Sequence, residues 1–152
     1  MAREGGGATR ARQRARELLI KALYQWQLAG HTLAELTEQF AVTPEFARID
    51  QTYFEQLLAA VLDDSKALDA LISRHAVRAI EQLDAVGRAI LLLALAELKH
   101  RSDVPTKVII NEAVELAKRY GAAESFRFVN AVLDKTAREL IERTAPSSKS
   151  AL

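Results

Sequence analysis

Apolar residues recur at spacings of three and four along almost the whole chain, and this spacing gives an α-helix one buried face. In the first helical segment the stripe consists of Ala11, Ala15, Leu18, Leu19, Ala22, Leu23 and Trp26. No segment shows the alternation of apolar and polar residues, bounded by turn signals, that indicates a strand. The sequence therefore predicts an all-α protein, a helical bundle of about seven helices. Helices are expected at 9–29, 33–40, 50–75, 84–100, 106–120 and 124–143, with one further turn at 43–46.

Polar and glycine residues mark where these helices begin, bend and end. Asp84 is expected to cap the helix that follows it, and Gly121 to end the helix that precedes it. The run Asp63-Asp64-Ser65 interrupts the apolar stripe of segment 50–75, so we expect a bend or a break there.

The length of 152 residues and the apolar content of 49% fit one globular domain with a real core. We expect a flexible basic leader at 1–8, the helical domain at 9–145 and a disordered tail at 146–152. Cysteine is absent, which excludes disulfides and thiolate metal sites. The longest apolar run, 89–96, is far shorter than the roughly 20 residues that cross a bilayer. The start of the chain lacks the apolar segment of a secretory signal, so a cytoplasmic protein without a membrane segment is expected.

Charge is distributed unevenly along the chain. Residues 1–30 carry six Lys or Arg and two Glu, a net charge of +4. Residues 31–98 carry five basic and eleven acidic residues, net −6, and residues 99–152 carry ten and seven, net +3. Two basic ends around an acidic middle indicate a polyanionic partner at the basic pole, although the overall net charge is only +1.

The residue patterns of the common catalytic sites are absent from the sequence. The three histidines have no metal-ligand spacing, and the run Gly5 to Gly7 has neither the preceding strand nor the lysine of a phosphate-binding loop. No nucleophile elbow is present either. We therefore expect no enzyme activity, no cofactor and no metal site.

The start of the first helix, "RARQRAR" at 10–16, is the candidate binding element. On a helical wheel, Arg10 and Arg14 fall on one flank of the apolar stripe, and Arg12 and Arg16 fall on the other. Taken alone, this pattern is more often the solvated start of a helix. The guanidinium fork nevertheless suits phosphate oxygens, and Tyr24, on the polar side of the helix, is placed to stack on unpaired bases.

The segment 86–99 is apolar nearly all round, because it carries Leu91, Leu92, Leu93, Leu95 and Leu98. Such a helix is usually buried on every side. The alternative interpretation is that Leu92 lies with Arg88 and Lys99 on an outer face that docks a partner protein.

Four segments of the chain resemble the NusB family of bacterial transcription antitermination factors, in the family's order and spacing over about residues 10–138. They are "RARQRARELLIKALYQWQL", "YFEQLLAAV", "RSDVPTKVIINEAVELAKRYG" and "FVNAVLDK". The resemblance implies two packed three-helix-type subdomains, about 9–76 and 77–145, without catalytic activity. It also implies a heterodimer with the small-subunit ribosomal protein NusE. That pair binds single-stranded boxA RNA of nascent rRNA transcripts and helps to assemble an antitermination complex on RNA polymerase.

The resemblance also gives roles to particular side chains. The family's arginine-rich motif maps onto Arg12, Arg14 and Arg16, with Arg10 just upstream. Tyr24 matches the tyrosine of the family's A-L-Y segment. Lys118 lies on the polar face of segment 106–120, which a solvated surface explains equally well. The candidate RNA contacts are Arg10, Arg12, Arg14, Arg16, Tyr24 and Lys118. The candidate partner contacts are Arg88, Leu92 and Glu124.

The chain departs from the family pattern in the helix before the D-V-P turn. Gly87, Leu92 and Ala96 stand where the family often carries Glu, Arg and an aromatic residue. This difference leaves open a diverged interaction module that forms a weak homodimer, or docks another partner, through segment 86–99. A third interpretation, the NusB-like part of an RNA methyltransferase, requires that the sequence be a fragment, because no cofactor-binding βαβ unit follows.

Overall fold

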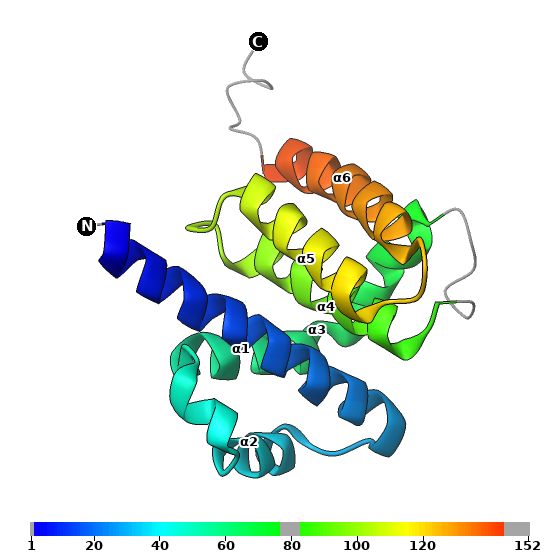
Figure 1. Cartoon of the computed structure of the whole chain (residues 1–152). Helices are drawn as coiled ribbons and strands as arrows, with labels where there is room; N and C mark the ends of the chain where they lie inside the picture. The colour runs from blue at the N-terminus through cyan, green and yellow to red at the C-terminus, as the bar shows by residue number, and fades with distance from the viewer. Residues whose placement is uncertain (1, 77–82, 145–152) are drawn as a thin grey trace.

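The computed structural model describes residues 2–76 and 83–144, with side chains from residue 6 to residue 141. This part of the chain is all-α, as predicted. It contains six α-helices and one 3₁₀-helix, so the expected total of about seven is met only if the 3₁₀-helix is counted (Figure 1). The elements are α1 (Ala2–Ala29), α2 (Leu33–Ala41), η1 (Pro44–Arg48), α3 (Gln51–His75), α4 (Ala85–His100), α5 (Thr106–Tyr120) and α6 (Ser125–Thr144).

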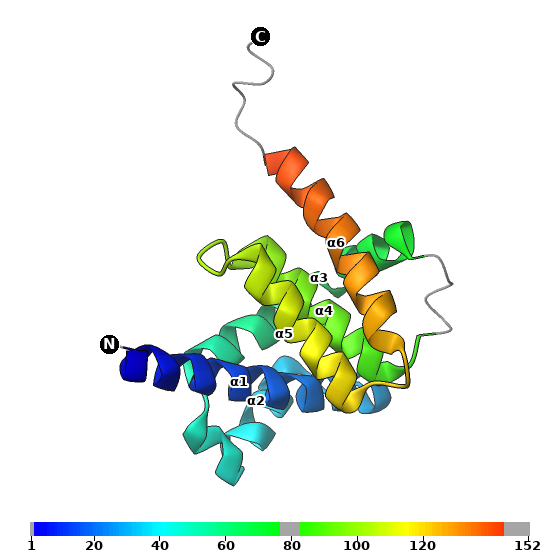
Figure 2. The same cartoon turned by 45° about the horizontal axis from the view of Figure 1, so that its top comes forward.

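Helix α4 is the centre of the bundle, since it packs against α1, α3, α5 and α6. Figure 1 shows α1, α2 and η1 gathered in its lower half and α5 and α6 packed together in its upper half. In both Figure 1 and Figure 2, the start of α1 lies at the opposite end of the molecule from the turn that joins α5 to α6. The predicted boundary between two subdomains falls at residues outside the described part of the chain, and the division stays a prediction.

The helix that is apolar nearly all round, α4, is the core helix, and the alternative interpretation that Leu92 lies on an outer docking face is wrong. Every residue of α4 from Ala89 to Glu97 is buried, and Leu92 is 0% exposed. Leu92 therefore cannot contact a partner in this structure, because the four helices around α4 already cover its side chain. The prediction that Leu92 is a partner contact is corrected on this ground.

Local signals set the helix ends largely as predicted. The Asp84 carboxylate accepts a 2.6 Å hydrogen bond from the backbone N–H of Gly87 and so caps α4. Gly121 follows α5, and its N–H donates to the carbonyl of Ala117. The expected bend of α3 is confirmed at Asp64, which has the non-helical angles φ −115° and ψ 16°.

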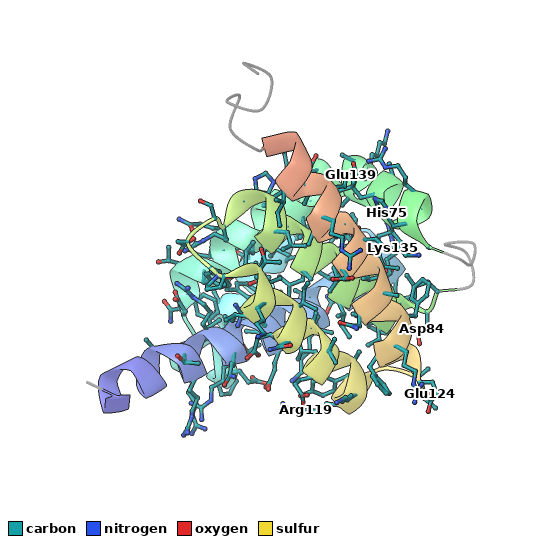
Figure 3. All side chains as sticks on the ribbon, turned by 90° about the horizontal axis from the view of Figure 1, so that it is seen from above. His75, Asp84, Arg119, Glu124, Lys135 and Glu139 are labelled. Carbon is teal, nitrogen blue, oxygen red and sulfur yellow. The ribbon has the colours of Figure 1, made fainter. Side chains whose placement is uncertain are left out.

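The far end of α3 is joined to α6 by charged side chains. Nη2 of Arg74 lies 2.9 Å from Oε2 of Glu139, and the His75 ring contacts the other oxygen of that carboxylate. Figure 3 shows His75 and Glu139 meeting between the two helices. Helix α6 packs against α5, and these contacts also hold it against α3 in the first half of the chain.

The start of the chain differs from the expected boundary. The structure extends α1 back to Ala2, whereas the sequence predicts that the helix begins at residue 9. Gly6 and Gly7 are exposed, and no atom lies within 4 Å of where a Cβ would stand. The predicted tail at 146–152 lies outside the described residues.

Candidate nucleic-acid interface

Arg16 belongs to a buried network and not to the surface. Its side chain is 4% exposed and that of Glu97 is 2% exposed, and Nη2 of Arg16 lies 2.8 Å from Oε1 of Glu97. Nε of Arg16 donates to both carboxylate oxygens, at 3.0 and 3.2 Å. The Tyr53 hydroxyl donates to the same carboxylate and accepts from Nη2 of Arg16 at 3.4 Å. The prediction that Arg16 contacts RNA is therefore corrected, because the guanidinium is enclosed.

The charges of this network are fixed by its geometry. Burial alone lowers the pKa of Arg16, but the hydrogen bond and the charge of Glu97 outweigh it and raise that pKa above its ordinary value. Burial and the adjacent Glu97 carboxylate raise the pKa of Tyr53. Arg16 therefore stays charged and Tyr53 stays neutral at physiological pH. The network is a structural link between α1, α3 and α4.

The ring of Tyr53 also supports two arginines that reach the surface. The guanidinium of Arg12 lies 4.2 Å from the ring centroid, and Nη2 of Arg12 lies 3.6 Å from Oδ2 of Asp50. The guanidinium of Arg101 lies 4.7 Å from the same centroid and donates to both oxygens of Asp103, at 3.0 and 2.9 Å. These hydrogen bonds from Arg101 lower the pKa of Asp103. Sequence reasoning missed Arg101, which gains its position only from this tertiary contact.

A groove of about 400 Å³ separates the start of α1 from the turn between α4 and α5. Its lining carries charges of both signs, since it includes two arginines and three carboxylates among apolar residues. The groove is lined by Ala8, Thr9, Ala11, Arg12, Arg16, Asp50, Asp103, Val104, Pro105, Val108 and Glu112. Of the six candidate RNA contacts, it brings together only Arg12 and Arg16.

Arg10 and Arg14 meet the requirements for phosphate contacts. Both are exposed, and neither forms an ion pair with any carboxylate among the described residues. They lie one turn apart on the same flank of α1, as the wheel predicts. An exposed guanidinium without a carboxylate partner keeps its donors available to a phosphate oxygen.

The other two candidate RNA contacts lie elsewhere. Tyr24 is ten residues after Arg14, which corresponds to about 15 Å along a helix axis. It lines an apolar groove of about 620 Å³ with Ile20, Leu28, Phe40, Val86 and Tyr120, together with Glu17, Lys21, Gln25 and Gln39. Lys118, near the end of α5, lies 3.6 Å from Glu115 and 5.2 Å from the centroid of the Phe126 ring. Neither side chain therefore adjoins the arginines at the start of α1.

Two site classes find no support in the described part of the chain. No three of its His, Asp or Glu side chains converge as metal ligands would. None of its helices is both long enough and apolar enough to cross a membrane.

The sequence model of the NusB family matches residues 13–138. This chain belongs to the NusB family. The transcription antitermination protein NusB of Alcanivorax borkumensis is 48% identical over 130 residues, which cover 86% of this chain and 87% of that protein.

Solved structures agree with this assignment. A crystal form of NusB from T. maritima has 32% identity and a TM-score of 0.71, covering 92% of this chain and 96% of that one. The crystal structure of antitermination factors NusB and NusE in complex with dsRNA contains a chain with 27% identity and a TM-score of 0.71. That match covers 86% of this chain and 98% of that chain.

The three candidate partner contacts, Arg88, Leu92 and Glu124, lie apart from one another. Arg88 is engaged, because its Nε and Nη2 donate to Asp69 at 3.0 and 2.5 Å and its guanidinium lies 5.5 Å from the Trp26 ring. Glu124 is exposed at the start of α6, has a φ of 69° and pairs with Arg127 at 2.8 Å. Figure 3 shows Glu124 at the α5–α6 end of the molecule. Leu92 is in the core, so the three do not form one surface.

Gly87, in the first turn of α4, has a local structural reason. A Cβ at this position would lie 2.9 Å from Oδ1 of Asp84 and 2.9 Å from Cδ1 of Leu83. Glycine therefore permits the close approach of the Asp84 cap to the first turn of α4. Its neighbour Val86 lines the apolar groove beside Tyr24.

Proposed function

We propose that this NusB family member is an RNA-binding transcription antitermination factor without catalytic activity. It acts in the bacterial cytoplasm as a heterodimer with the ribosomal protein NusE. The pair binds boxA-type RNA of nascent rRNA transcripts and joins an antitermination complex on RNA polymerase. The observation that carries the proposal is the pair of exposed arginines, Arg10 and Arg14, without carboxylate partners among the described residues.

The RNA surface of this proposal is the start of α1. Arg10 and Arg14 contact phosphates, and Arg12, oriented by the Tyr53 ring and Asp50, stands on the other flank of the apolar stripe. Each phosphate contact releases counterions, so affinity falls as salt rises. Arg16 contributes indirectly, because it fixes α1 to α4 through Glu97.

The partner surface of this proposal is the apolar groove lined by Tyr24, Leu28 and Tyr120. These three side chains are exposed although they are large and apolar. Contiguous exposed apolar side chains with a polar rim are typical of protein interfaces. The complex of NusB and NusE with dsRNA among the similar structures supports NusE as a partner, and we assign that partner to this groove. Tyr24 is therefore reassigned from RNA to this partner.

Self-association through the leucine-rich helix is not supported, because α4 is buried from Ala89 to Glu97. A second copy of the chain that covers the Tyr24 groove would instead compete with NusE. Sedimentation of the protein alone and with NusE distinguishes the two occupants. A concentration-dependent homodimer that NusE does not displace would contradict the assignment of this groove to NusE.

Fluorescence anisotropy with labelled boxA RNA tests the function directly. The controls are a scrambled single strand and a duplex of the boxA sequence, each titrated with the protein alone and with NusE. We expect selective binding of single-stranded boxA RNA that strengthens when NusE is present. Equal affinity for all three RNAs, with no gain from NusE, would refute the proposed function.

A matched pair of substitutions tests the partner surface. Leu28 is 66% exposed in the groove, and Val42 is 82% exposed outside it. We expect Leu28→Asp to weaken NusE binding by about tenfold or more, since it places a charge in an apolar interface. Val42→Asp should leave the affinity for NusE unchanged. If the two variants bind NusE with equal affinity, the groove is not the NusE-binding surface.

A further inference from the structure

Most arginines with a described side chain form an ion pair with a carboxylate. The ion-paired arginines are Arg12, Arg16, Arg74, Arg88, Arg101, Arg119, Arg127 and Arg138. Three others, Arg10, Arg14 and Arg48, form no ion pair with a described carboxylate, and all three are exposed. Arg48 is the last residue of η1.

Arg14 and Arg48 face the same small groove. This groove has a volume of about 160 Å³ and is lined by Arg14, Glu17, Leu18, Lys21, Glu45, Arg48 and Ile49. The two arginines come from different elements, α1 and η1, and so approach the groove from two sides. Arg10 lies one turn before Arg14 on the same flank of α1.

The position of η1 beside α1 is fixed by the backbone and the core. The N–H of Asp50 donates to the carbonyl of Ala11 at 3.0 Å, which joins the segment after η1 to the start of α1. Phe46 and Ile49 are buried on either side of Arg48 in sequence. The backbone that carries Arg48 is therefore held in place before any ligand binds, which reduces the entropy lost on binding.

The acidic residues of the groove already have partners. Oε2 of Glu45 lies 3.5 Å from Nζ of Lys21, and Oε2 of Glu17 lies 2.5 Å from Nη1 of Arg119. These ion pairs neutralise the negative charge of both carboxylates. The positive charge that remains at the groove is that of Arg14 and Arg48.

We propose that Arg14 and Arg48 form a clamp for an RNA phosphate, which extends the RNA surface from α1 onto η1. This inference rests on the proposed function, because it takes single-stranded RNA as the ligand. Two guanidinium groups that approach from different elements can donate to different oxygens of one phosphate or to successive phosphates. The clamp contacts only the backbone, so it strengthens binding of boxA and scrambled RNA alike.

Salt-dependent anisotropy with NusE present tests the clamp. The variants are Arg48→Gln, Arg14→Gln and, as a matched control, Arg138→Gln, which removes the same charge from an exposed position on α6. At about 50 mM salt, we expect Arg14→Gln and Arg48→Gln each to weaken RNA binding by about three- to tenfold. Each should also reduce the slope of log affinity against log salt by about 0.7, the value for one phosphate contact on a single strand. Arg138→Gln should match the wild type.

The possible outcomes distinguish failure of the proposed clamp from failure of the proposed function. If the wild type binds boxA RNA selectively but Arg48→Gln behaves like Arg138→Gln, the clamp is wrong and the proposed function stands. If the wild type with NusE does not bind RNA, both are wrong. Arg48→Lys keeps the charge and should retain most of the slope of log affinity against log salt. A reduction of that slope as large as the one for Arg48→Gln would contradict a phosphate contact. Circular dichroism of each variant confirms that the helices are intact.

Discussion

Removing the carboxylate of Glu97 should destabilise the protein severely, because it leaves a charged guanidinium enclosed between α1, α3 and α4. Arg16 and Glu97 are both almost fully buried and share three contacts between 2.8 and 3.2 Å. In Glu97→Ala, the nearest remaining carboxylate to Arg16 is that of Glu112, at 4.0 Å. Leaving one partner of such a pair buried alone costs about 3–5 kcal/mol.

That loss is a large part of the total free energy of unfolding, which is about 5–15 kcal/mol for a natural domain. For a chain of this length it corresponds to a fall in Tm of roughly 6–20 °C. Urea denaturation followed by circular dichroism measures it. The control is Glu115→Ala, which removes an exposed carboxylate of α5 that pairs with Lys118 and should change stability by less than about 0.5 kcal/mol.

A combined variant tests the reason for the loss. Arg16→Met, Tyr53→Phe and Glu97→Leu together remove the whole buried polar network, and apolar replacement of a buried ion pair is often neutral or stabilising. We expect this triple variant to be more stable than Glu97→Ala. The reasoning is refuted if Glu97→Ala lies within about 1 kcal/mol of the wild type, or if the triple variant is the less stable of the two.

Two further predictions concern stability. The pKa of Tyr53 is raised in the folded state, so the stability from its protonated form is complete below its ordinary pKa of 10.0 and is lost as pH rises above that value. Denaturation at a series of alkaline pH values should therefore show that the free energy of unfolding falls more steeply with pH for the wild type than for Tyr53→Phe. Equal slopes of the free energy of unfolding against pH would contradict this prediction. At Gly121, a Cβ would lie 2.7 Å from the backbone oxygen of Ala117 and 2.4 Å from Oγ of Ser125. Gly121→Ala should lower stability by about 1–3 kcal/mol, whereas Gly6→Ala, with open space around it, should not lower Tm.

The helices could be predicted because their causes are local. The apolar spacing identifies each buried face, and residues such as Asp84 and Gly121 act within one turn of their own helix. The bend at Asp64 follows from the polar interruption of one stripe. These signals operate over a few residues, and a single sequence contains all of them.

The division of the arginines into paired and unpaired could not be predicted, because it depends on residues far apart in the chain. Arg16 is separated from Glu97 by 81 positions. One signal was present, since Glu97 is an acidic residue that directly follows the apolar run 89–96, and a buried acidic residue requires a partner. Arg48 lies in a short turn with no periodicity, so only the packing of η1 against α1 shows that it lies beside Arg14.

The most direct test of the central claim is the salt dependence of boxA RNA binding, with NusE present, by a double variant of the unpaired arginines. The account predicts that Arg10→Gln with Arg14→Gln lowers the slope of log affinity against log salt by about 1.4, the value for two phosphate contacts. The control, Arg127→Gln with Arg138→Gln, removes two ion-paired arginines of α6 and should keep the wild-type slope. Equal slopes for the two double variants would show that the start of α1 is only a solvated helix end and would contradict the account.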